Sequence, residues 1–185
     1  MPVWSRGEYN AEGSFDYFLH ANLSAVTASF LTAWVTTPEQ SAMLRFHWLD
    51  APLRPPCFTV THLEQFERDP GQQARIVTPQ GNVGAHVRHI TEVSVWHSRY
   101  SAVNSAFNPN WPRQLRQLAE MVPYLFQSGA KAAPLLDLNS ATAAPFTTAG
   151  IIRFVDLRAV SPPPDPNPAF IRRRFLWTWD VLQFV

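Results

Sequence analysis

The residues whose types are best suited to bind another molecule lie near the C-terminus, in the stretch from Phe170 to Trp179. This stretch holds a run of three arginines, the densest charge in the sequence, together with four aromatic residues. Arginine binds phosphate groups and aromatic rings stack on bases, so such a stretch could bind single-stranded nucleic acid. A strand would give these residues a different role.

In a strand, successive side chains point to opposite faces. Trp177 and Trp179 would then share a core-facing side with Phe175, whereas Arg172 and Arg174 would lie on the other side. Those arginines could pair with acidic residues of a neighbouring subunit. A subunit contact or a solvated edge is the simpler interpretation of the charge.

Three histidines, His86, His89 and His97, form the nearest candidate metal cluster. On a strand, His86 points away from the other two. His89 and His97 are eight residues apart, or roughly 26 Å at about 3.3 Å per residue. With no cysteine pair and no H-E-x-x-H motif, these residues are interpreted as ordinary surface or core histidines. We expect neither metal nor cofactor.

The single cysteine, Cys57, follows Pro55 and Pro56 and is expected to be a small buried apolar residue. A catalytic thiol would have to be exposed and paired with an oriented histidine. The sequence contains no G-x-S-x-G, P-loop or G-x-G-x-x-G motif. These features favour a protein that is not an enzyme.

Composition narrows the class of protein further. The chain has 185 residues and a net charge of +1, so no overall field draws it to nucleic acid or membranes. Its 17 prolines against 7 glycines indicate long, extended connections. No signal peptide and no membrane-spanning run is expected. Near-neutral charge, exposed Pro-rich loops and more tryptophans than one core can bury favour a structural or assembly protein.

The stretch from Ala85 to Arg99 is the best candidate for a central strand. Its odd positions are mostly apolar and its even positions mostly polar, the period of a half-buried strand. A helical pattern and strands lie on both sides of it in the sequence. We expect both halves of the chain to pack on this strand.

The first half predicts a helix and a set of strands. Residues 1–12 are expected to form an ordered arm or a frayed end. Apolar residues from Phe15 to Trp34 recur at helical spacing behind a possible cap at Ser14. The following predictions complete the first half: a strand at Met43–Leu49, a Pro-rich loop at Asp50–Pro56, a strand at Cys57–Leu63, a turn-rich segment at Glu64–Gln73, and a short strand at Ala74–Thr78 that forms a hairpin with the central strand.

The second half predicts one helix and two strands. Asn110 is a suitable helix cap, Pro112 suits the first turn, and Pro123 should kink or shorten the helix before a stop at Gly129. Further predictions are a loop and contact arm at Ala130–Gly150, a strand at Ile151–Val160, a Pro-rich connection at Ser161–Pro168, and a last strand at Phe170–Val185.

Together these elements predict one domain over residues 1–185, with an α+β fold. A mainly antiparallel, mixed sheet would be flanked by two helices, with a projecting Pro-rich hairpin or loop arm.

The chain resembles the tail-terminator, or tail-completion, proteins of long-tailed bacteriophages. The resemblance lies in the order and character of its segments. It includes the amphipathic first helix, DAPLRPP running into CFTV, and the helix PRQLRQLAEMVPYLF. It then includes IIRFVDLRAV, a proline-rich break, and the strand FIRRRFLWTWDVL.

This resemblance implies a mixed sheet flanked by helices and a non-enzymatic virion protein, assembled in the host cytoplasm. Six copies would close a ring at the head–tail junction that caps the tail tube and joins it to the head. Tube and connector proteins would be its partners, with nucleic acid only as DNA passing through the ring. The subunit contacts expected are Arg172, Arg173, Arg174, Leu53 and Arg54. The alternative is a single-stranded nucleic-acid-binding protein that uses the basic, aromatic C-terminal strand.

Overall fold

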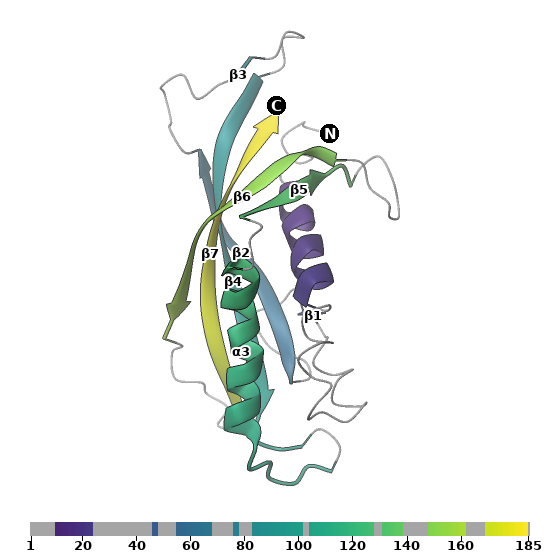
Figure 1. The fold of residues 1–185 in the computed structure, drawn as a ribbon, viewed down its shortest axis with the longest axis vertical. Coiled ribbons are helices and arrows are strands. Elements are labelled where there is room, and N and C mark those ends of the chain that lie inside the picture. The colour runs from purple at the N-terminus through teal and green to yellow at the C-terminus, as the bar shows by residue number, and fades with distance from the viewer. Residues whose placement is uncertain are drawn as a thin grey trace.

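The computed structural model describes residues 10–23, 46–47, 55–67, 76–77, 83–101, 104–127, 131–138, 148–161 and 169–184. The elements in chain order are a helix over residues 10–23, β1 (Phe46–His47), β2 (Cys57–Glu67), β3 (Ile76–Val77), β4 (Val83–Ser98), α3 (Trp111–Gln127), β5 (Ala132–Leu136), β6 (Thr148–Val160) and β7 (Phe170–Phe184). Figure 1 shows a long, strongly twisted sheet with both helices alongside it.

The strands form one sheet in the order β1-β2-β4-β7-β6-β5, and β3 pairs with the start of β4. Every pairing is antiparallel except that of β1 with β2. The predicted α+β fold, a mainly antiparallel sheet flanked by helices, is confirmed. Both helices contribute to one hydrophobic cluster on the sheet.

The expected central strand is confirmed as β4, which lies between β2 and β7. Its odd positions face the same side as their β7 partners, so Val93 is level with Phe175 and Thr91 with Trp177. This face forms the core. The even positions of β4 carry the polar side chains of the opposite face.

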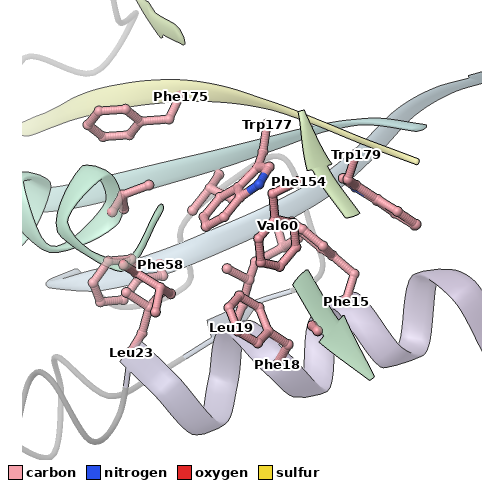
Figure 2. Packing of buried hydrophobic residues seen from close by; sticks show 14 of the residues in the cluster. Phe15, Phe18, Leu19, Leu23, Phe58, Val60, Phe154, Phe175, Trp177 and Trp179 are labelled. Atoms are coloured by element: carbon pink, nitrogen blue, oxygen red, sulfur yellow. The ribbon is translucent and has the colours of Figure 1, made fainter. Parts of the chain in front are cut away.

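The core is centred on aromatic contacts between the first helix and β7. The ring of Phe15 stacks on Trp179 with 4.9 Å between centroids and meets Trp177 edge-on at 5.5 Å. Phe18 packs against Phe154 of β6 at 4.8 Å. Figure 2 shows these side chains converging between the helix and the sheet. Since Trp177 and Trp179 are fully buried, they do not supply the exposed tryptophan surface that the composition suggested.

The first helix begins earlier than the sequence predicted. It includes Asn10, so Ser14 lies inside the helix and is not its cap. The Ser14 hydroxyl donates to the carbonyl of Asn10 and accepts the N–H of Leu136 in β5 at 2.8 Å. The side chain of Asn10 accepts the N–H of Leu138 at 3.0 Å. These polar residues therefore attach the helix to β5. Residues 24–34 of the predicted helix lie outside the described residues.

Two predicted irregular segments are partly strand. Residues 64–67, expected to be turn-rich, continue β2 and pair with β4 after a bulge at Leu63. Within the predicted loop Ala130–Gly150, β5 pairs with the first part of β6. Both predictions were wrong because a bulge or a proline interrupts the sequence alternation without ending the backbone pairing.

The second helix starts as predicted. The carbonyl of Asn110 accepts the first helical bond, from Gln114 at 3.1 Å, and Pro112 lies in the first turn. Pro123 does not end the helix, which continues to Gln127. The predicted stop at Gly129 lies outside the described residues.

The predicted hairpin also forms, since Ile76 pairs with Gly84 and Val77 with Val83. Figure 1 shows β3 and the start of β4 extending beyond both helices, as a projecting arm. Most of the Pro-rich segments Asp50–Pro56 and Ser161–Pro168 lie outside the described part of the chain.

We predict that Phe15→Ala lowers the free energy of unfolding by about 3–5 kcal/mol, because it removes the ring that stacks on Trp179 and leaves a cavity. Urea denaturation measures this. The matched control is Tyr17→Ala on the exposed side of the same helix, which should change stability by less than about 0.5 kcal/mol. Equal losses in the two variants would contradict the assignment of the core.

Candidate functional site

The three arginines predicted to contact a neighbour lie near the start of β7 and point to both faces of the sheet. Arg172 and Arg174 are level with Trp96 and Ser94 of β4 on the polar face, whereas Arg173 is level with Val95 on the other. Arg173 is exposed, and Arg172 and Arg174 are half-buried. The expected alternation of Arg172 and Arg174 against Trp177 and Trp179 is confirmed.

Arg174 has an acidic partner within its own chain. Its guanidinium forms an ion pair with Glu92 of β4, and the other carboxylate oxygen of Glu92 accepts the Ser94 hydroxyl at 2.7 Å. Burial opposes ionisation of Glu92, but the hydrogen bonds from Arg174 and Ser94 outweigh it, so the pKa of Glu92 lies below its ordinary value. The hydrogen bond to Glu92 raises the pKa of Arg174. This pair joins the two central strands.

The guanidinium of Arg172 stacks on an aromatic ring. This group lies 4.9 Å from the centre of the Trp96 ring, and the Trp96 N–H donates to the Thr59 hydroxyl at 2.9 Å. A stacked arginine keeps its N–H edges available for other partners. The polar face therefore links β2, β4 and β7 through side chains, and Arg173 is the most exposed of the three arginines. Leu53 and Arg54 lie outside the described residues, so the contact role of all five stays a prediction.

A second group of polar side chains, which sequence reasoning missed, lies at the rim of the core. The two ring nitrogens of His62 contact Asp16 of the first helix at 3.0 Å and the Thr91 hydroxyl of β4 at 2.9 Å. Thr91 also accepts the N–H of Trp179 at 3.0 Å. Asp16 and His62 are 46 residues apart in sequence, so no local motif could have shown their contact.

The order carboxylate, imidazole, hydroxyl is that of a nucleophilic triad. A nucleophile has to reach a substrate, however, and Thr91 is 0% exposed. Its oxygen already accepts a hydrogen bond from Trp179. The geometry therefore suits attachment of the first helix to the sheet, with Asp16 and His62 satisfying each other at the rim of the core.

His89 is a buried titratable group next to this network. Its ring stacks on Trp179 with 4.0 Å between centroids. Burial, assisted by the nearby His62, lowers the pKa of His89 to about 4, although Asp180 acts in the opposite direction. The residue is therefore neutral at physiological pH.

The histidines do not assemble a metal site within the residues that the structure describes. His89 and His97 are buried on the core face, and His86 lies on the other face, as the alternation predicted. Among the described side chains, no three His, Cys, Asp or Glu residues are grouped so that they could hold a metal ion. Cys57 is buried, as predicted.

The sheet has two open edges at which large apolar side chains are exposed. In the part of the sheet that the structure describes, residues 63–67 of β2 pair only with β4, and residues 155–160 of β6 pair only with β7. On β2, Leu63 and Phe66 are 47% and 45% exposed. On β6, Val155 is 45% exposed in the open part of the strand, and Ile151 is 57% exposed in the part that pairs with β5. We call these surfaces the β2 edge and the β6 edge.

The neighbouring edge at β5 is covered. Ser14 and Asn10 of the first helix accept the N–H groups of Leu136 and Leu138, and Pro134 has no N–H to offer. Covering by a helix and placement of a proline are two ways in which proteins block an edge strand. The exposed parts of β2 and β6 lack this cover among the described residues.

Neither the family models nor the curated proteins compared with this chain match it. None of the described helices is long and apolar enough to cross a membrane.

We predict that His89 makes stability depend on pH. The unfolded residue takes up a proton near pH 6.5 and the folded residue only near 4, so the unfolded state binds more protons between these values. The free energy of unfolding should therefore fall as the pH drops from about 6.5 to about 4, by on the order of 3 kcal/mol. Urea denaturation across this range measures the effect.

The variant His89→Gln should lose this component of the pH dependence, whatever its stability at neutral pH. His86→Gln, on the opposite face, is the control and should keep the slope of the wild-type protein. A slope in His89→Gln equal to that of the wild-type protein would contradict the role assigned to His89.

Proposed function

We propose that this chain is a non-enzymatic structural subunit that forms a ring, of the tail-terminator kind in long-tailed bacteriophages. The α+β fold, with its mainly antiparallel sheet flanked by two helices, is the architecture that the resemblance implies and supports the proposal. In this role the ring caps the tail tube at the head–tail junction of the virion, where it contacts tube and connector proteins. Assembly takes place in the host cytoplasm.

The observation that carries the proposal is the pair of open edges on opposite sides of one sheet. A ring of identical subunits needs two different, mutually complementary surfaces on each copy. The β2 edge and the β6 edge are separated by β4 and β7. Leu63 and Phe66 are exposed at the β2 edge, and Val155 is exposed at the β6 edge. They are suited to meet when one copy follows another around a ring.

The charges of the two edges are also complementary. The β2 edge carries the exposed carboxylate Glu64, whereas the β6 edge carries the exposed Arg158. A second exposed arginine, Arg153, lies next to this edge, where β6 still pairs with β5. Arg158 is held by Asp156 at 2.9 Å, but both side chains are largely exposed and the pair is weak. Opposite charges around an apolar centre favour one register and disfavour the pairing of like edges.

Bulges give the two edges their shape. Register shifts place Leu63 on β2 and Val155 on β6 out of step with their neighbouring strands. A bulge changes the direction of the side chain of its extra residue. It also hinders the backbone of an edge strand from pairing non-specifically with another strand. We therefore assign the contact mainly to side chains, in a closed ring of six copies as the resemblance implies.

In the alternative function, the stretch from Phe170 to Trp179 would bind single-stranded nucleic acid. Trp177 and Trp179 are 0% exposed and stack within the core, so their faces are not open to bases in the folded protein. The ring proposal needs no such exposure.

A mixing experiment tests whether unlike edges meet. We expect Leu63→Asp and Val155→Asp each to reduce the oligomer of the full chain to a monomer, because each places a charge in the apolar centre of one edge. Mixing the two variants should restore one contact only, between the intact β2 edge of Val155→Asp and the intact β6 edge of Leu63→Asp. Light scattering should then record a heterodimer.

The control is Tyr17→Asp, on the exposed side of the first helix and on neither strand edge, which should keep the wild-type mass. Circular dichroism verifies that each variant is folded. A variant that forms homodimers by itself would show that like edges meet. A wild-type chain that stays monomeric at every concentration would overturn the ring.

A further inference from the structure

One end of the molecule concentrates positive charge and exposed aromatic rings. There β4 ends, β7 begins, and a short connection leads into α3, as the lower part of Figure 1 shows. We call this surface the basic end and define it by Arg99, Tyr100, Phe107, Arg113, Arg116, Arg172 and Arg173.

Contacts across the connection hold the basic end together. The N–H of Arg99 donates to the carbonyl of Ala169, directly before β7, at 2.9 Å. The guanidinium of Arg99 lies 5.7 Å from the centre of the Trp111 ring at the start of α3. In the sheet, Ser98 is level with Phe170. Segments from three parts of the sequence therefore meet at this end.

Few carboxylates lie near the positive charge at the basic end among the described residues: Arg172 acts electrostatically on Glu92, and Glu120 follows Arg116 by one turn of α3. Residues 93–119 and 166–179 contain no Asp or Glu. Arginines elsewhere in the sheet have acidic partners, Arg88 with Asp180 and Arg174 with Glu92. The five arginines that define the basic end form no ion pair with any residue that the structure describes. Exposed Arg113 also lies in the first turn of α3, where the helix dipole adds positive potential, and exposed Arg116 lies in the next turn. An anionic partner would relieve this repulsion.

Two exposed aromatic residues lie in the middle of this charge. Tyr100 and Phe107 are 46% and 61% exposed, and their rings meet edge-on with 6.3 Å between centroids. Their backbones form a β-bridge. Further bonds from Ser101 to Ala106 and from Asn108 to Arg99, both at 2.8 Å, close the connection around them. The rings are thus held outward by an ordered backbone, which lowers the entropy lost on binding.

We propose that the basic end binds single-stranded nucleic acid. The arginines contact phosphates, and Tyr100 and Phe107 stack on unpaired bases. An acidic protein surface would match the arginines but offers no flat partner for the exposed rings. Duplex DNA hides the faces of its bases. This inference is independent of the ring, because every residue that it uses belongs to one copy.

The test is binding of a fluorescein-labelled oligothymidylate of about 20 nucleotides to the full chain, followed by anisotropy at salt concentrations from about 50 to about 200 mM. We expect binding that weakens with salt. Arg113→Gln combined with Arg116→Gln should weaken binding and flatten the salt dependence, because each lost phosphate contact lowers the slope by about 0.7 for a single strand.

Tyr100→Ala combined with Phe107→Ala should weaken binding at least about tenfold while leaving the salt slope unchanged, since stacking releases no counterions. All four side chains are exposed, and thermal unfolding verifies that the folds are intact. The matched controls are Phe66→Ala on β2 and Arg153→Gln on β6, which should bind like the wild-type chain.

Labelled poly-L-glutamate serves as the competing polyanion. Binding of poly-L-glutamate as tight as that of the oligonucleotide would overturn the proposal and assign the basic end to an acidic protein. Absence of oligonucleotide binding at the lowest salt would also overturn it. So would equal losses in the control variants and the basic-end variants. None of these results bears on ring formation, which is tested separately by measuring the mass of the oligomer with light scattering.

Discussion

The stacking of Phe15 on Trp179 is the contact on which the arrangement of this protein depends. It places the first helix over β7, and around it Asp16, His62 and Thr91 satisfy their polar groups at the junction of helix and sheet. Hydrophobic burial supplies the driving force, and the hydrogen-bonded network fixes the position of the helix. Because the helix also covers β5, this one junction determines which strand edges stay open.

The two faces of the sheet consequently differ in character. One face holds the aromatic core. On the other face, side-chain contacts join the strands, such as the ion pair of Glu92 with Arg174 and the stacking of Arg172 on Trp96. Because Glu92 and Arg174 are already paired with each other, they are poorly placed to be the main contacts of a partner. The surfaces that we propose for partners are instead the β2 edge, the β6 edge and the basic end, which lie at the periphery of the same sheet.

The sequence alone supported prediction of the long strands and the face that each buries, because β4 and β7 alternate regularly between apolar and polar residues. It did not reveal β5, which is short and contains a proline, or the extension of β2 beyond its bulge at Leu63. Partners distant in sequence were also missed. Glu92 and Arg174 are 82 residues apart, and no local pattern indicates that the charge assigned to a neighbour is satisfied within the chain.

We propose that copies of this chain join through unlike sheet edges into a closed ring. Electron microscopy of the concentrated full-length protein tests it most directly. We expect closed rings of a single diameter, with the sheets following one another around the circumference. Particles of monomer size at every concentration, or open filaments of variable length, would contradict it.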